Sequence, residues 1–190
     1  MTLGRIIIIS GPSGSGKTTL YKRLLERSKD LVKSISVTTR KRRPGERNGR
    51  DYFFVTKEAF LKRKRQGAFL EYQKVFDNYY GTPYQNVRKL LQKGKNVLLC
   101  IDVKGARVVK RKFKDAVKIF IKTPSMSVLR KRLEKRGSED KKTISLRFET
   151  AKRELKEAKR YDYVIVNNNL DVSCERLSAI VNSILKGSPR

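Results

Sequence analysis

A glycine-rich segment near the start of the chain has the residue types that bind phosphate. Residues 11–18 read Gly-Pro-Ser-Gly-Ser-Gly-Lys-Thr and match the pattern G-x-x-x-x-G-K-S/T at every fixed position. The glycines let successive backbone N–H groups turn inward at a helix N-terminus, where unpaired donors favour negative charge. Lys17 is expected to reach the β- and γ-phosphates of a nucleotide, and Thr18 to place its hydroxyl on Mg²⁺. The segment therefore predicts a nucleoside triphosphate site.

The segments on either side of this loop have the patterns that the motif requires. An apolar run, Arg5-Ile-Ile-Ile-Ile-Ser10, precedes it and is typical of a buried strand, while Thr19 to Glu26 reads as a helix. The alternative is a Gly- and Ser-rich turn that binds nothing. Because eight positions match within a strand–loop–helix order, the phosphate site is favoured.

Length and composition exclude several classes of protein. The 190 residues suit one domain with a substantial core, and no apolar stretch approaches the ~20 residues that span a bilayer. The N-terminus lacks a signal-peptide pattern, so we expect a cytoplasmic protein. Cys100 and Cys174 have no metal-ligand or redox spacing. The sequence contains no histidine, which excludes imidazole bases and histidine metal sites.

The charge balance is strongly basic, with 47 Lys and Arg against 18 Asp and Glu and a net charge of +29. Such a charge attracts polyanions. The basic residues are nevertheless spread along the chain, mostly where helices would expose them, and no interleaved aromatic residues or recognition motif accompany them. We therefore expect no specific nucleic-acid partner, although non-specific binding at low salt follows from the charge. The oligomeric state stays open.

Strand-like and helix-like segments alternate along most of the chain. Expected core strands lie at 5–10, 31–37, 96–101, 117–121 and 163–166, and expected helices at 19–26, 84–93, 103–112, 125–136, from about 143 to 160, and 170–186. Five strands that alternate with helices predict a parallel sheet covered on both faces, with ligands at the carboxyl ends of the strands.

The stretch from residue 38 to about residue 93 has a different character. Strands are expected at 52–55, 69–75 and 78–81, with a helix at 57–66 and a turn at Phe76-Asp77. This pattern indicates an inserted α+β subdomain.

Several motifs in the first half of the chain closely resemble the guanylate kinase family in order and spacing. They are Ser36-Val-Thr-Thr-Arg40, Arg43-Pro-Gly-Glu46, Asn48-Gly-Arg-Asp-Tyr52-Phe-Phe-Val55, Phe69-Leu-Glu71, Asn78-Tyr-Tyr80-Gly81-Thr82 and Ile101-Asp102-Val-Lys-Gly105. The resemblance extends from Arg5 to about Leu185. It implies transfer of the γ-phosphoryl group of ATP to GMP with Mg²⁺.

The resemblance also implies a domain organisation. The fold would be an α/β P-loop three-layer fold with a five-stranded parallel core sheet, an inserted α+β GMP-binding subdomain and a helical lid. The whole chain, 1–190, would form one domain, with the core at 1–36, 94–136 and 161–187, the GMP-binding subdomain at 37–93 and the lid at 137–160.

The family pattern assigns a GMP pocket whose residue types suit the ligand. Arginine forks and phenolic hydroxyls match a dianionic phosphate, and a carboxylate can accept from both N1–H and the 2-amino group of guanine. Glu71 is that acceptor, with Ser36 and Thr82 completing the edge; taken singly, Glu71 would read as a surface carboxylate and Tyr80 as a packing aromatic. The expected GMP-binding residues are Ser36, Arg40, Arg43, Glu46, Tyr52, Glu71, Tyr80, Gly81, Thr82 and Asp102.

The ATP side follows from the loop and from the resemblance. The expected ATP-binding residues are Gly11, Pro12, Ser13, Gly14, Ser15, Gly16, Lys17, Thr18, Thr19, Arg132, Arg136 and Asn168, and the expected catalytic cations are Lys17, Arg40, Arg136 and Arg147. Asn167 or Asn168 could contact the adenine, or form a turn or helix N-cap before Leu170. Residues 137–140 read as the flexible tip of the lid.

Two positions depart from the family pattern. Cys100 stands where a second acidic residue is common two positions before Asp102, and Lys104 stands where Gln is common. The role of Asp102 therefore stays open between purine recognition, water-mediated Mg²⁺ ligation or both. Thr18 is the expected metal contact, through the nucleotide.

Two other functions remain as alternatives. A related P-loop kinase could act on another nucleotide or a phosphorylated metabolite, but Glu71 with Ser36 and Thr82 argues against it. A catalytically inactive binding module of the same fold has no reason to keep an intact Gly16-Lys17-Thr18.

Overall fold

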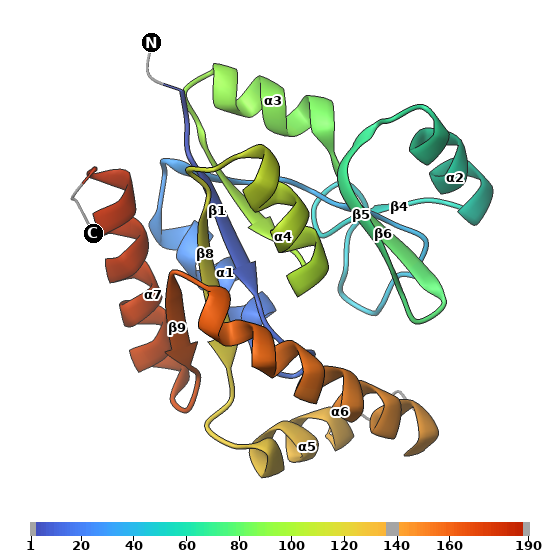
Figure 1. The fold of residues 1–190 in the computed structure, drawn as a ribbon, viewed down its shortest axis with the longest axis vertical. Helices are drawn as coiled ribbons and strands as arrows, with labels where there is room; N and C mark the ends of the chain where they lie inside the picture. Colours follow the sequence, from blue (N-terminus) through green and yellow to red (C-terminus); the bar gives the residue numbers. More distant parts are fainter. Residues whose placement is uncertain (1–2, 136–140, 188–190) are drawn as a thin grey trace.

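The computed structural model describes residues 3–135 and 141–187, and a five-stranded sheet forms its centre (Figure 1). The strand order is β2-β7-β1-β8-β9, and each neighbouring pair is parallel. The strands are β1 (Ile6–Ser10), β2 (Leu31–Lys33), β7 (Asn96–Cys100), β8 (Val117–Lys122) and β9 (Tyr163–Val166). The predicted parallel α/β core is confirmed.

Helices cover both faces of this sheet because its central strand is apolar on both sides. Ile7 and Ile9 of β1 pack into one hydrophobic cluster, and Ile6 and Ile8 into another. The first cluster includes residues of two helices, α1 (Lys17–Arg27) and α7 (Leu170–Leu185), and the second includes residues of α3 (Tyr84–Gln92) and α4 (Val103–Lys112). A strand buried on both faces reads as a continuous apolar run, which is the pattern of residues 6–9.

A second, four-stranded sheet in the order β4-β3-β6-β5 forms the inserted part. Its elements are β3 (Val37–Thr38), β4 (Phe53–Phe54), α2 (Lys57–Arg65), β5 (Phe69–Val75) and β6 (Asn78–Pro83). Phe60 of α2 is fully buried against this sheet and stacks on Phe69, at 4.5 Å between ring centroids, and on Tyr79, at 5.3 Å. The sheet therefore has a small aromatic core of its own.

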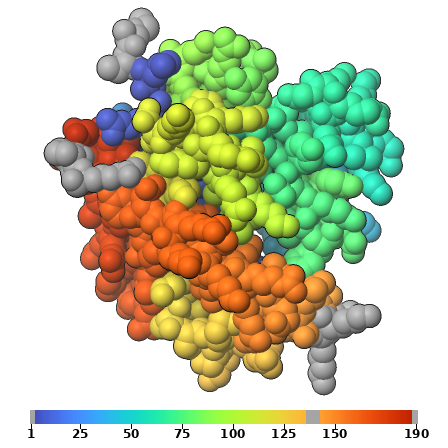
Figure 2. Space-filling model, viewed as in Figure 1, coloured from blue at the N-terminus to red at the C-terminus, as the bar shows by residue number. Residues whose placement is uncertain are grey.

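Two further helices, α5 (Met126–Glu134) and α6 (Lys141–Lys156), pack together below the carboxyl ends of the core strands (Figure 1). Ser125 caps α5 by accepting a hydrogen bond from the Val128 amide at 3.2 Å. A short 3₁₀ turn, η1 (Glu157–Arg160), joins α6 to β9. In the space-filling view α4 lies between α6 and the β5–β6 hairpin (Figure 2).

The sequence-based prediction was wrong about one strand. Residues 31–37 do not form a single element, because the chain leaves the core sheet after Ser34, whose amide still donates to the Leu98 carbonyl. The Ser36 carbonyl already accepts from Phe53 in the second sheet. A local apolar pattern cannot show that consecutive residues pair with different sheets.

Smaller differences concern the ends of elements. The expected strand at 52–55 is limited to β4, and the charged helix ends at Lys156. Arg136 and the expected lid tip at 137–140 lie outside the described residues. No helix in the described parts of the chain is long and apolar enough to cross a membrane.

The aromatic core of the second sheet generates a stability prediction. Phe60→Ala leaves a cavity between Phe69 and Tyr79 and should lower the free energy of unfolding by about 3–5 kcal/mol. Phe53→Ala is the control, because its ring is 37% exposed and its loss should cost less than about 1 kcal/mol. Urea denaturation followed by circular dichroism measures both; equal costs would contradict this packing.

Candidate functional site

The phosphate loop (residues 11–18) joins β1 to α1 at the carboxyl edge of the core sheet. Gly11, Gly14 and Gly16 all have positive φ values, of 145°, 86° and 91°. A Cβ on Gly11 would lie 2.0 Å from the Ile121 carbonyl oxygen, so no larger residue fits. The first turn of α1 contains no acidic residue, and its N-cap, Gly16, offers no side-chain acceptor. The amide donors of this helix end are therefore suited to an anionic ligand.

Lys17 lies within the curve of this loop. Its ammonium group donates to the carbonyl oxygens of Gly11, at 2.5 Å, and Pro12, at 2.8 Å. The loop thus holds a cation beside its own inward amide groups. Because the cation and the amide groups are already in place, they can stabilise charge on a phosphate with little reorganisation of the protein.

Asn167, at the end of β9, braces the loop from the side. Its side-chain amide nitrogen donates to the backbone carbonyl of Ser15 at 2.8 Å. Its backbone carbonyl accepts from the Arg132 guanidinium at 3.0 Å. The N-cap of α7 is Asn169, whose side chain accepts from the amides of Asp171 and Val172. Asn167 therefore supports the phosphate loop. Neither Asn167 nor Asn168 is the N-cap of α7.

An open pocket of about 320 Å³ lies beside the loop. Its lining consists of Gly14, Gly16, Thr19, Arg132, Asn167, Asn168 and Leu170. Asn168, Thr19 and Arg132, three of the residues expected to bind ATP, thus line one pocket. Thr18 is exposed in the first turn of α1.

Arg147 reaches the phosphate loop from α6. Its guanidinium donates to the Ser13 hydroxyl at 3.1 Å and lies 5.1 Å from the ring centroid of Phe76 in the β5–β6 turn. Arg130 behaves differently, because its guanidinium stacks on Phe148 at 4.5 Å. The structure therefore brings Arg147 to the loop and places Arg130 on a helix–helix contact.

The second sheet contributes a buried carboxylate. Glu71 is only 6% exposed, and its Oε1 accepts a hydrogen bond from the Thr82 hydroxyl at 2.6 Å. Its Oε2 approaches the start of α4, where a Cβ on Gly105 would lie 2.4 Å away. Asp102, the N-cap of α4, accepts from the Gly105 amide at 2.7 Å. The lack of a Cβ at Gly105 thus lets the Glu71 carboxylate approach the N-terminus of α4, where Asp102 also lies.

Burial controls the protonation of both groups. It raises the pKa of Glu71 to about 7, an effect that the Thr82 hydrogen bond opposes and the Asp102 charge increases. Burial also raises the pKa of Asp102, against the hydrogen bond from Gly105. A buried carboxylate with unused acceptor capacity is a strong acceptor for donors on a ligand.

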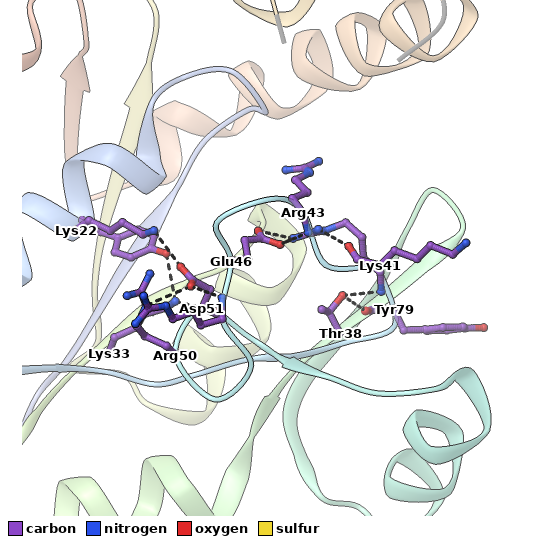
Figure 3. A network of polar contacts seen from close by, with 12 residues as sticks. Lys22, Lys33, Thr38, Lys41, Arg43, Glu46, Arg50, Asp51 and Tyr79 are labelled. Atoms are coloured by element: carbon purple, nitrogen blue, oxygen red, sulfur yellow. Dashed lines mark hydrogen bonds and ion pairs between the residues drawn. The ribbon is translucent and has the colours of Figure 1, made fainter. Parts of the chain in front are cut away.

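The arginine loop (residues 40–52) holds its own acidic residue Glu46 against basic neighbours (Figure 3). Arg40 donates to both oxygens of Glu46, at 2.7 and 3.0 Å, and Glu46 also accepts from the Arg43 amide at 2.8 Å. Desolvation opposes a charged Arg40, but the Glu46 hydrogen bonds raise the pKa of the guanidinium. Glu46 therefore contacts Arg40 rather than an open binding surface.

Neighbouring residues complete the position of Arg40. The guanidinium lies 5.5 Å from the Tyr52 ring centroid, and Tyr52 meets Tyr80 edge-on at 6.1 Å. Thr38 donates to the Tyr79 carbonyl at 2.9 Å and accepts from the Arg40 amide at 3.2 Å. Sequence reasoning did not assign this function to Thr38.

Two remaining predicted residues serve packing in the second sheet. A Cβ on Gly81 would lie 2.8 Å from the Phe69 ring, so this glycine makes room for the aromatic core. Ser36 is 8% exposed, and its carbonyl accepts from the Phe53 amide at 2.9 Å.

Glu154 on α6 is a residue that sequence reasoning missed. Burial raises the pKa of Glu154 to about 7, while the Lys17 charge opposes the rise and the Asp102 charge adds to it. The available signal was helical spacing, because Glu154 follows Arg147 by seven residues and the buried Ala151 by three, which places all three on one face. Glu154 therefore lies within electrostatic range of Lys17 and Asp102.

A larger cavity of about 840 Å³ lies away from this site, near the start of β1 and β8. Two of its basic residues are already bonded: Arg5 donates to the Ile184 carbonyl and Lys110 to the Ala116 carbonyl, both at 2.8 Å. These cations hold chain ends and turns together.

The raised pKa of Glu71 generates a prediction about stability and pH. The unfolded carboxyl ionises near its ordinary value of 4.5 and the folded one near 7, so stability from the protonated form is lost as pH rises through this window. Glu71→Gln keeps an acceptor for Thr82 without the charge. At pH 8 it should raise the free energy of unfolding by up to about 3 kcal/mol, and at pH 4.5 by far less.

Urea denaturation at both pH values measures this difference. Glu26→Gln, an exposed change on α1, is the control and should have the same small effect at each pH. A Glu71→Gln effect that is independent of pH would contradict the burial of an ionisable Glu71.

Comparisons with known proteins identify relatives of this chain. A family model described as guanylate kinase matches residues 3–184. A guanylate kinase of Caldanaerobacter subterraneus subsp. tengcongensis is 48% identical over 178 residues, which cover 94% of this chain and 86% of the relative. One of Wolbachia pipientis wMel is 48% identical over 180 residues, with 94% and 90% covered.

A solved structure extends the likeness to three dimensions. The crystal structure of guanylate kinase from Anaplasma phagocytophilum matches with a TM-score of 0.81 at 36% identity, covering 97% of this chain and 88% of that one. With sequence and fold matching over nearly its whole length, the chain belongs to the guanylate kinase family.

Proposed function

We propose that this chain transfers the γ-phosphoryl group of ATP to GMP, giving ADP and GDP. The observation that carries the proposal is the buried Glu71–Thr82 pair, because Glu71 approaches Gly105 at the start of α4, and the strand before α4, β7, pairs with the β1 strand that leads into the phosphate loop. The relatives named above are guanylate kinases, and no observation in the described residues favours another acceptor.

The acceptor base is selected by hydrogen-bond complementarity. Guanine presents N1–H and a 2-amino group on one edge, and the ionised carboxylate of Glu71 can accept from both. Ser36 and Thr82 would bond O6 or the ring. Adenine lacks both donors and would leave Glu71 desolvated without a partner, a mismatch that can supply selectivity on the order of 10⁴.

The GMP phosphate would bind the arginine loop. Arg40 and Arg43 offer guanidinium donors, and Tyr52 and Tyr80 offer phenolic hydroxyls. The role of Glu46 is to hold Arg40 through its two hydrogen bonds rather than to touch a dianion. A preset guanidinium loses little freedom when the phosphate arrives.

Phosphoryl transfer needs positioning and cations more than covalent chemistry. The phosphate-loop amides and Lys17 would hold the ATP phosphates, and Arg147 would reach the transferring group from α6. Arg132 and Asn168 line the pocket beside the loop, where the nucleoside of ATP would lie. Arg136, outside the described residues, completes the expected set of lid cations.

Mg²⁺ fits the donor set without a dedicated protein cage. In the described ranges no three Cys, Asp or Glu side chains form a metal-binding group, and Mg²⁺ commonly binds phosphates and waters with one or two protein oxygens. Thr18 would supply its hydroxyl, and Asp102 would act through water. When bound, the ion neutralises charge on the phosphates.

Three further expectations stay predictions. They are the division into core, GMP-binding subdomain and lid, the cytoplasmic location, and the lack of a specific nucleic-acid partner.

A panel of nucleoside monophosphates tests the proposed function. In a coupled assay with ATP and Mg²⁺, the wild-type chain should phosphorylate GMP far better than AMP, CMP or UMP. Glu71→Gln should lower kcat/KM for GMP strongly and narrow its margin over AMP, because an amide offers one acceptor and adds donors. An unchanged GMP/AMP ratio would assign Glu71 to structure alone.

The two arginines on α5 and α6 give a second test. Arg147→Ala should lower kcat by up to about 10³ with little change in ATP affinity, because a guanidinium at the transferring group acts mostly in the transition state. Arg130→Ala removes a cation of α5 that stacks on Phe148 of α6, and it should stay within about twofold of wild type. Equal losses of kcat would show that Arg147 has no special position.

A further inference from the structure

Asp51 lies where the arginine loop meets the core, and its carboxylate is nearly enclosed. The residue is 4% exposed. Its Oδ1 pairs with the Lys22 ammonium of α1 at 2.9 Å, and its Oδ2 accepts from the Arg47 amide at 2.9 Å and contacts Arg50 Nε at 3.3 Å (Figure 3). One carboxylate therefore joins the core helix to two residues of the loop.

The backbone of Asp51 makes a second connection to the core. Its carbonyl accepts a hydrogen bond from Lys33 of β2 at 2.9 Å. The same ammonium donates to the Tyr21 hydroxyl at 3.1 Å and lies 5.5 Å from the ring centroid of Tyr52. Two core elements thus contact Asp51, one through its side chain and one through its main chain.

The charges at this junction explain why an acid is needed. Residues 40–52 contain six basic side chains and two acidic ones, Glu46 and Asp51. Glu46 is engaged by Arg40, which leaves Asp51 to oppose the repulsion between the basic loop and the Lys22 and Lys33 ammonium groups. Burial alone would raise the pKa of Asp51. The Arg47 amide and the Lys22 and Arg50 charges instead hold this pKa at about 2.

The connection also links the two proposed substrate sites. Lys22 is on the same helix as Lys17 and Thr18, less than two turns further along, so α1 extends from the phosphate loop to Asp51. Tyr52, next to Asp51, lies against Arg40 and Tyr80. A shift of the Asp51 contact would therefore move the groups proposed to bind the acceptor phosphate.

We propose that Asp51 is a positioning residue, which fixes the arginine loop on α1 and β2 through Lys22 and Lys33. It thereby determines where the groups that would bind the acceptor's phosphate lie relative to the phosphate loop. The inference rests on the proposed function for its kinetic consequence. Its structural consequence, a fixed arginine loop, does not depend on which acceptor binds.

The test compares three neutralising changes with a matched control. Asp51→Asn and Lys22→Met remove the ion pair, while Arg23→Met removes the ion pair that the next residue of α1 makes with Asp171 of α7, away from the loop. Displacing phosphate ligands should raise the GMP KM by about tenfold or more for Asp51→Asn. The ATP KM should stay within about twofold, since the phosphate loop is untouched. Lys33→Met should act in the same direction.

A double variant and a rescue separate positioning from general destabilisation. The double variant Asp51→Asn/Lys22→Met should raise the GMP KM no more than Asp51→Asn alone does, because the two changes remove the same ion pair. Lys22→Arg should restore most of the wild-type GMP KM. Arg23→Met should leave both KM values unchanged. A folded Asp51→Asn variant with unchanged GMP KM, or with GMP and ATP KM raised alike, would overturn the proposal.

Hydrogen exchange supplies a readout that does not use a substrate. Amides of residues 40–52 should exchange faster in Asp51→Asn and Lys22→Met than in wild type, while those of β1 and β7 stay protected. If Asp51→Asn does not fold, Lys22→Met serves for both the kinetic and the hydrogen-exchange measurements. Unchanged exchange in residues 40–52 would refute the positioning role of Asp51 even if the GMP KM rose as expected. Wild-type failure to phosphorylate GMP would refute the proposed function separately.

Discussion

Holding many positive charges in fixed places before any phosphate is bound is the constraint on which this structure depends. The carbonyls of Gly11 and Pro12 hold Lys17, and Glu46 holds Arg40. The Asn167 carbonyl positions Arg132. In each case an oxygen of the protein accepts a hydrogen bond from the cation. A phosphate oxygen would replace or join that acceptor. Because the charges are already oriented, binding and transfer need little reorganisation.

The same constraint shapes the contact between the two sheets. A loop with six basic side chains is repelled by a basic core, so the attachment needs acids at defined points. Asp51 supplies one at α1, and the Glu71 carboxylate approaches Gly105 at the start of α4, where Asp102 is the N-cap. In a chain of net charge +29, the buried acids thereby gain a structural importance that their number does not suggest.

Much of the fold was predictable because its signals are local. Residues 6–9 form a continuous apolar run, which indicated a central strand, and the glycines of the phosphate loop indicated the turn after it. The hairpin β5–β6 and helix α4 were also predicted, with α4 at its observed bounds. The strand at 31–37 was not, since pairing with one sheet or the other depends on distant residues such as Leu98 and Phe53.

By itself, the sequence determined the chemistry: a phosphate loop, an excess of cations, a carboxylate at position 71 and the order of strands that brings their carboxyl ends together. Only the tertiary structure decided which charges face one another. It brought Glu46 into contact with Arg40 and Asn167 into contact with the phosphate loop, and it joined Asp51 to Lys22 and Lys33. The reason is physical: residue type sets what a group can donate or accept, whereas burial and distance, which determine its pKa and its partner, arise from segments far apart in the chain.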